Sequence, residues 1–256
     1  MLRYPVAAFA LPFTLLTYLI PYHFLGRAFS VDGRAVGLER LAGYPDFGHL
    51  VVLGTILGTY AISVFFGMGA GLKQDQRQGV LESNWVTPAG RLPLLLGRSL
   101  AHLAVTTVQV AFLVAGATPL FGLPFHLHTL GTLVTVLLPT LAGLYGLGLV
   151  IAGIVLLVRQ AESLLDITSW AMNTLSGQSF PVSVLPRGLL LVSLAIPLTY
   201  GIDALRGAVL GTRTLLPLPT SLLVLWGLAV LLTAAGLGVF AWAERRARQL
   251  GLLGMH

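Results

Sequence analysis

Long apolar runs with few charged residues occupy most of this chain, and they restrict its fold more than any other feature. Hydrophobic residues make up 56% of the sequence and charged residues only 9%, against about 25% charged in an ordinary soluble domain. A helix needs about 20 apolar residues to cross a hydrocarbon core of ~30 Å. The sequence therefore predicts an all-α integral membrane protein with six transmembrane helices.

The apolar runs form one transmembrane domain, residues 1–256. Basic residues near the ends of short loops favour a cytoplasmic position for both termini. We expect a multi-pass protein of the inner or plasma membrane, and no cleaved leader, because no small-residue cleavage site follows the first apolar run. The predicted spans are residues 4–26, 50–72, 94–121, 129–158, 164–181 and 219–243, with a cytoplasmic loop at 73–92 and an outer segment at 182–212.

Residues 173–211 are as apolar as a membrane helix but contain glycines and prolines that interrupt or end helices. The apolar run between Arg187 and Asp203 is shorter than the about 20 residues that a full crossing needs. We therefore predict that the fifth span breaks and that a re-entrant outer segment follows it. Broken backbone at membrane depth survives only when it is buried in protein or lines a cavity, so we expect a functional region here. The interrupting residues are Gly177, Pro181, Pro186, Pro197 and Gly201.

The polar loop 73–92 contains Val80, Leu81 and Trp85 at a spacing that places them on one helical face. This pattern indicates a short amphipathic helix on the inner membrane surface. From these residues alone two interpretations stay open. The helix anchors the loop in lipid, or it binds a partner.

The residues present argue against several kinds of chemistry. Lys73 is the only lysine and no Gly-Lys-Ser/Thr sequence contains it, so the chain cannot supply a phosphate-binding P-loop. Cysteine is absent, and we interpret His126 and His128 as a solvated loop pair rather than a metal site. The 15 basic residues are scattered between apolar runs, which argues against nucleic-acid binding. We predict no metal site and no catalytic residues.

Two pairs of charged residues lie about one helical turn apart. Asp203 and Arg206 would share one face of a short helix, and a structural ion pair is favoured over a direct substrate contact. Glu162 and Asp166 lie where the fifth span begins, near its cytoplasmic end. A solvated interfacial position is therefore favoured for them over a proton relay.

Residues 176–211, SGQSFPVSVLPRGLLLVSLAIPLTYGIDALRGAVLG, resemble the signature of the type-2 export family of ATP-binding cassette (ABC) transporter permeases. That signature contains Ser-Gly, Phe-Pro, Leu-Pro and Pro-Leu-Thr-Tyr in a similar order, followed by an aspartate and an arginine. The matching residues here are Ser176, Gly177, Phe180, Pro181, Leu185, Pro186, Pro197 to Tyr200, Asp203 and Arg206.

A second resemblance lies in residues 77–100, RQGVLESNWVTPAGRLPLLLGRSL, which are similar to the cytoplasmic loop of that family. The family loop has the form Gly-x-Leu-Glu followed by Thr-Pro, which Gly79, Leu81, Glu82, Thr87 and Pro88 match. Family members often have an amphipathic helix before the first span. Only Met1 to Arg3 precede the first predicted span here, so we expect that helix to be absent or displaced.

The resemblance implies a membrane subunit that works with a second permease copy or a sister permease. Two copies of a separate cytoplasmic ATP-binding subunit would bind ATP and Mg, so this chain would hold no cofactor and would not itself be an enzyme. The implied ATPase-coupling residues are Arg77, Gly79, Val80, Leu81, Glu82, Trp85, Thr87 and Pro88. The implied outer-gate residues are Ser176, Gly177, Phe180, Pro181, Pro186, Pro197, Tyr200, Asp203 and Arg206.

The resemblance leaves the cargo open. We expect export of a small hydrophobic or amphipathic compound, a drug or a lipid-linked molecule. We also expect membrane lipid to surround the protein. The alternative is a secondary transporter or channel driven by an ion gradient. That class favours inverted repeats and acids near the middle of the membrane, whereas the acids here lie near the ends of the predicted spans.

Overall fold

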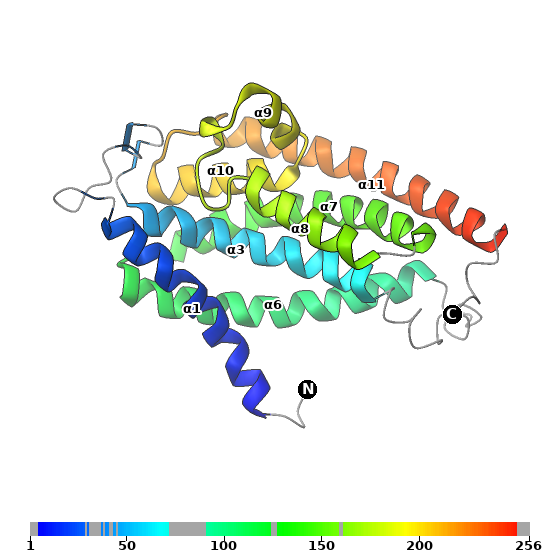
Figure 1. Ribbon diagram of the computed structural model, residues 1–256. Coiled ribbons are helices and arrows are strands. Elements are labelled where there is room, and N and C mark those ends of the chain that lie inside the picture. Colours follow the sequence, from blue (N-terminus) through cyan, green and yellow to red (C-terminus); the bar gives the residue numbers. More distant parts are fainter. Residues whose placement is uncertain are drawn as a thin grey trace.

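The computed structural model describes residues 5–28, 30, 37, 39–40, 43–44, 46–71, 91–123, 127–158 and 161–249. Every regular element in this part of the chain is helical, so the predicted all-α class is confirmed for it (Figure 1). The longer helices are α1 (Pro5–Ala28), α3 (Phe47–Phe65), α6 (Arg91–Phe121), α7 (Leu127–Leu157) and α11 (Leu218–Gln249). The shorter ones are α8 (Ala161–Leu175), α9 (Arg187–Leu194) and α10 (Pro197–Leu210), with a π-helical turn η1 (Phe66–Ala70) and a 3-10 turn η2 (Val182–Val184).

Four helices of the described part are long and apolar enough to cross a membrane, and the number rises to five if α9 and α10 form one bent span. The chain is therefore a multi-pass membrane protein. Helices α1 and α8 lie where the first and fifth spans are predicted, and the count of six spans stays a prediction. The four long apolar segments are Phe47–Gly69, Leu92–Phe121, Leu130–Leu157 and Leu218–Ala247.

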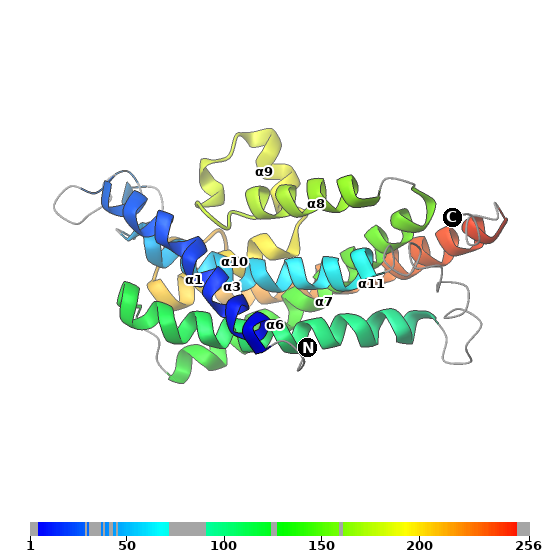
Figure 2. The same ribbon diagram turned by 60° about the horizontal axis from the view of Figure 1, so that its bottom comes forward.

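Helix α3 is the most enclosed of these helices. It contacts α1, α6, α7, α8 and α10, and its residues Val51, Val52 and Leu53 are fully buried. Its first turn is capped by Asp46, whose side chain accepts a hydrogen bond from the backbone N–H of His49 at 3.2 Å. The other helices are arranged around α3, with α8 and α9 standing off to one side of the bundle (Figure 2).

Helices α7 and α11 make the most extensive helix–helix contact, and both run in the same direction (Figure 1). Glycines allow their backbones to meet. A Cβ atom added at Gly146 would lie 2.4 Å from the backbone of Leu232 and Thr233, and one added at Gly236 would meet the carbonyl of Gly146. Association between helices in lipid depends on close packing, which such small residues permit.

The chain after α8 is broken, as the glycines and prolines predict. Gly177 has a φ of +77°, a left-handed conformation that favours glycine and ends the helix. Proline cannot continue a helix but can begin one, and accordingly Pro186 precedes α9 and Pro197 is the first residue of α10. Helices α9 and α10 meet at 92°, which is the geometry of a broken span or a re-entrant loop.

We expect Gly146→Ala to lower the free energy of unfolding by about 1–3 kcal/mol, because the added methyl group would press against the backbone of α11. The matched control is Gly238→Ala on α11, where nothing lies within 4 Å of the added atom. Alanine favours helices over glycine, so the control should be neutral or up to about 1 kcal/mol more stable. Unfolding of the purified protein in mixed detergent micelles measures both. Equal stability of the two variants would contradict the close approach of α7 and α11.

Candidate functional site

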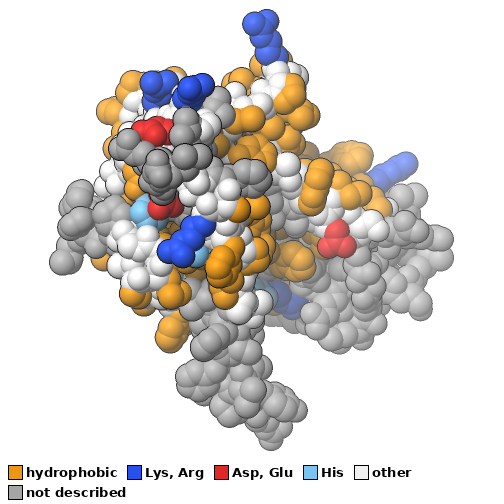
Figure 3. Space-filling view, turned by 60° about the vertical axis from the view of Figure 1, so that its left-hand side comes forward, with side chains coloured by type: hydrophobic (Ala, Val, Ile, Leu, Met, Phe, Trp, Pro, Cys, Tyr) orange, Lys and Arg blue, Asp and Glu red, His pale blue; other side chains and the backbone are white. Residues whose placement is uncertain are grey.

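The chain from the turn after α8 to the end of α10, residues 176–210, is here called the broken segment. It meets the first turns of α3, at the end of the bundle where α3 and α7 begin (Figure 1). Ser176 and Gly177 are buried in the turn after α8, and Pro197 and Arg206 are buried on α10. Among the other predicted gate residues, Phe180, Pro181, Tyr200 and Asp203 are half-buried and Pro186 is exposed. Figure 3 looks toward this end, where single charged and histidine side chains lie among hydrophobic ones.

Arg206 is the centre of this region. Its side chain is buried, with 5% of the residue exposed, and its guanidinium donates only to backbone carbonyls. Nε and Nη2 donate to the carbonyl of Leu50 on α3 at 2.9 and 2.6 Å. Nη1 donates to Gly177 at 2.8 Å, and Nη2 also donates to Gln178 at 2.6 Å. Arg206 therefore joins α10 to α3 and to the turn after α8.

Asp203 has a different partner. Its carboxylate accepts the backbone N–H of Leu215 at 2.7 Å, in the loop between α10 and α11. The direct ion pair expected between Asp203 and Arg206 is not formed, although both residues are described, because each side chain is committed to backbone groups of other segments. Both side chains hold the broken segment in place through bonds to the backbone. The preference for a structural role over cargo contact stays a prediction.

A small pocket lies between the turn after α8, α10 and α3. Its volume is about 20 Å³, which is enough for about one water molecule and too little for a transported compound. It brings together four of the predicted gate residues, Ser176, Pro181, Asp203 and Arg206, and leaves the other five outside its lining. The remaining lining residues are Leu50, Val182, Thr199, Ile202, Thr212 and Arg213.

The sequence did not indicate a role for Gln178, or for Gly54 and Gly58 of α3, which lie against it. A Cβ atom at Gly54 would collide with the carbonyl of Gln178, and one at Gly58 would collide with its side-chain amide. The turn after α8 thus rests directly on the α3 backbone. The Gly-x-x-x-Gly spacing of these α3 residues is a known sign of close packing in membranes and could have indicated this contact.

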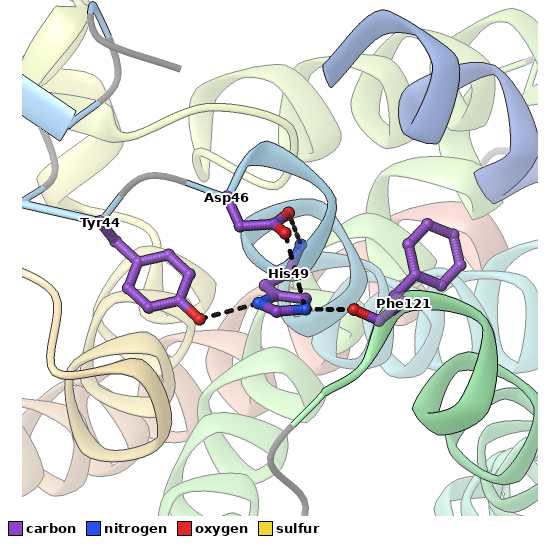
Figure 4. A network of polar contacts seen from close by, with 4 residues as sticks. All are labelled: Tyr44, Asp46, His49 and Phe121. Atoms are coloured by element: carbon purple, nitrogen blue, oxygen red, sulfur yellow. Dashed lines mark hydrogen bonds and ion pairs between the residues drawn. The ribbon is translucent and has the colours of Figure 1, made fainter. Parts of the chain in front are cut away.

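A second polar cluster, also not predicted, closes the start of α3 (Figure 4). Nε2 of His49 donates to the carbonyl of Phe121 at the end of α6, because a carbonyl can only accept. In the neutral imidazole Nδ1 is then an acceptor, and the hydroxyl of Tyr44 donates to it at 2.8 Å. Burial, and to a lesser extent the carboxylate of Asp46, raise the pKa of Tyr44 and keep it protonated as this donor. The cluster ties the segment before α3 to α3 and α6.

The predicted ATPase-coupling residues lie outside the described residues. The helices that flank this loop end and begin at the opposite end of the bundle from the pocket, beside the last turns of α11 (Figure 1). There Nη1 of Arg98 on α6 donates to the carbonyl of Gly71 at 2.9 Å. The residues concerned are Arg77, Gly79, Val80, Leu81, Glu82, Trp85, Thr87 and Pro88.

Among the described residues, no group of three or more His, Asp or Glu side chains is placed to hold a metal ion. His126 lies outside that part of the chain, and the side chain of its neighbour His128 is not described. The described part of this site consists of side chains bonded to backbone groups and of helices packed closely at glycines.

We expect Arg206→Leu to lower the free energy of unfolding by about 2–4 kcal/mol, because the carbonyls of Gly177 and Gln178 would lose their donor. Arg206→Lys should recover only part of this, since one ammonium group cannot reach three carbonyls in the same geometry. Arg187→Leu is the control, because Arg187 is exposed. Unfolding in mixed micelles measures all three, and equal losses for Arg206→Leu and Arg187→Leu would contradict the clamp.

Comparison with known proteins agrees with this architecture. The family model described as ABC-2 type transporter matches residues 9–210, which is most of the chain and includes the broken segment as far as the end of α10. No curated protein matches the sequence. The chain therefore belongs to the ABC-2 type transporter family, and it is a membrane subunit of an ABC transporter.

Proposed function

We propose that the chain forms half of the translocation path of an ATP-driven exporter. The other half is a second permease copy or a sister permease, and two separate ATP-binding subunits supply the energy. The observation that carries this proposal is the broken segment from α8 to α10, which Arg206 fixes against α3 and which lies within the range matched by the family model.

The broken segment is proposed as a cap over the outer end of the path. Helix α8 has 15 residues, so at ~1.5 Å per residue it is about 22 Å long and shorter than the ~30 Å hydrocarbon core. The turn after it, η2 and α9 would then enter the membrane and leave it on the same outer side. The buried backbone of the turn is satisfied by the Arg206 guanidinium, as irregular backbone at membrane depth requires.

The loop 73–92 is proposed as the docking site for the ATP-binding subunit. In this arrangement both termini and the loop face the cytoplasm, and the cap faces the outside of the inner or plasma membrane. ATP and Mg would bind only in the partner. ATP binding and hydrolysis there would shift the two permease halves between inward and outward access through differential binding to the two states.

The proposed cargo is a small hydrophobic or amphipathic compound, a drug or a lipid-linked molecule. The low charge of the chain supports this class, because 9% of its residues are charged and a path for ions needs charged or polar rings. Many large apolar side chains are exposed on the helices, among them Trp170 on α8 and Leu223 on α11. These side chains suit contact with lipid and with apolar cargo.

For the docking loop, we expect the double variant Leu81→Asp with Glu82→Arg to lose copurification with the ATP-binding partner subunit. Leu81→Asp would remove an apolar contact and Glu82→Arg would reverse a charge. We therefore expect the affinity for the ATP-binding subunit to fall by at least about tenfold. Arg187→Glu reverses a charge at the proposed outer side and should copurify normally. Wild-type copurification and ATPase stimulation by the double variant would refute docking at this loop.

For the cap, we expect Gly177→Leu to reduce ATP-driven transport at least about tenfold while the variant still assembles with the ATP-binding subunit. Gly177 has a positive φ, and a Cβ atom there would lie 2.5 Å from the side chain of Val182. Gly188→Leu on α9 is the control, because nothing lies within 4 Å of the added atom. Transport of a fluorescent hydrophobic dye into inverted vesicles and copurification are measured together. Normal transport by Gly177→Leu would overturn the cap.

A further inference from the structure

The last turns of α11 carry an exposed pair of arginines beside an exposed tryptophan. Trp242 is 60% exposed, and Arg245 and Arg246 are exposed as well. Nη1 of Arg246 donates to the side-chain oxygen of the exposed Gln249 at 3.5 Å, so this guanidinium lies along the outward surface of the helix. Spacings of three, four and seven residues from Trp242 place these side chains on one side of α11. The residues Trp242, Arg245, Arg246 and Gln249 are here called the α11 terminal patch.

The length of α11 brings this patch to the level of the lipid headgroups. Helix α11 has 32 residues, so at ~1.5 Å per residue it is about 48 Å long. A bilayer measures ~30 Å across its hydrocarbon core and about 40–45 Å with its headgroup layers. A spanning helix of this length reaches both headgroup layers, so its last turns lie in one of them. These turns extend past the ends of α6 and α7 in both views (Figure 1, Figure 2).

The charge of the patch is positive. Neither arginine forms an ion pair with a carboxylate among the described residues. Glu244 comes two residues after Trp242 and therefore lies about 200° around the helix from it, on a different side. Arg98, at the start of α6, is instead bonded to the carbonyl of Gly71. Guanidinium groups at headgroup level attract anionic lipid, and each can bind a phosphate through two N–H groups.

An exposed apolar track leads along α11 to the two arginines. Leu231 is 63% exposed, and a Cβ atom added at Gly238 would meet nothing within 4 Å, so this surface is open. The opposite side of the helix is the one that packs on α7, through Gly236. Members of the track recur every three or four residues and therefore share one face. The track consists of the exposed residues Leu231, Ala235, Gly238 and Trp242.

We propose that the α11 terminal patch binds an anionic phospholipid. The guanidinium groups of Arg245 and Arg246 hold the phosphate, Trp242 lies at the boundary between headgroup and hydrocarbon, and the acyl chains lie along the apolar track. A zwitterionic phospholipid carries the same phosphate, but the arginines repel its ammonium group, so the patch selects for net negative charge. This inference goes beyond the proposed export function and does not depend on which side of the membrane the patch faces.

The test measures which lipid lies next to Trp242. Phenylalanine replaces the other three tryptophans, Trp85, Trp170 and Trp226, and the chain is placed in lipid nanodiscs. Bromine atoms on acyl chains quench tryptophan fluorescence at short range. Brominated phosphatidylglycerol is compared with brominated phosphatidylcholine, each at low mole fraction in unbrominated phosphatidylcholine. We expect the anionic lipid to quench Trp242 with at least about fivefold higher relative affinity. Equal quenching by the two lipids would overturn the proposal.

Substitutions then assign the preference to the arginines. Arg245→Gln together with Arg246→Gln should abolish it, whereas Arg245→Lys with Arg246→Lys keeps both charges and should retain most of it. A chain with Trp226 as its sole tryptophan is the matched control. Trp226 is 51% exposed on the same helix but lies about 24 Å from Trp242 along it, so it should show no preference. A preference that the double glutamine variant leaves unchanged, or that Trp226 shares equally, would refute the assignment.

A second readout uses the wild-type chain, so the test survives if the single-tryptophan chain fails to fold. Native mass spectrometry is applied to protein released from micelles that contain equal amounts of the two unbrominated lipids. We expect bound phosphatidylglycerol to be retained at least about fivefold more often than phosphatidylcholine. Equal retention of the two lipids would contradict the proposal.

The ATP-binding subunit is the competing occupant of the patch. Copurification of that subunit is measured with the wild-type chain and with the variant that combines Arg245→Gln and Arg246→Gln. Loss of copurification by the variant, together with equal quenching of Trp242 by both lipids, would assign the patch to the partner and overturn the proposal. Normal copurification together with the lipid preference would support it.

Discussion

At the end of the bundle where α3 begins, the structure depends on one buried guanidinium, that of Arg206. Arg206 donates to carbonyls on two separate segments, α3 and the turn after α8, while its own backbone belongs to α10. A turn between helices leaves carbonyls that no helix satisfies, and each of them needs a donor when it is buried. A planar cation with five N–H groups meets several of them at once. The break in the fifth helical region is tolerated because this side chain lies beneath it.

Glycines on α3 let the turn after α8 come close enough for Arg206 to bond to it. The carbonyls that Arg206 reaches are close to α3 because Gly54 and Gly58 let Gln178 rest on the helix backbone. On the other side, α10 rests on α7, where Pro197 faces Gly143 and Gly201 faces Thr140. The broken segment is therefore held from both sides by contacts that leave no room for a Cβ atom.

The sequence predicted the helical class, the site of the break and its causes, because apolar run length and the positions of proline and glycine act locally. It did not predict the partners of Asp203 and Arg206. Their spacing shows only that they share a helix face, whereas their bonds depend on which distant backbone segments lie opposite. The cluster of Tyr44, His49 and Phe121 was missed for the same reason, since His49 and Phe121 meet only after folding.

The contact between α7 and α11 has a mechanical consequence. Where backbone meets backbone, as at Gly146 and Gly236, no flexible side chain separates the two helices to absorb a turn of one against the other. We therefore expect α7 and α11 to tilt or slide together. Because α10 rests on α7, a displacement of this pair would also move the segment that carries Arg206. The pair would then link the two ends of the bundle mechanically.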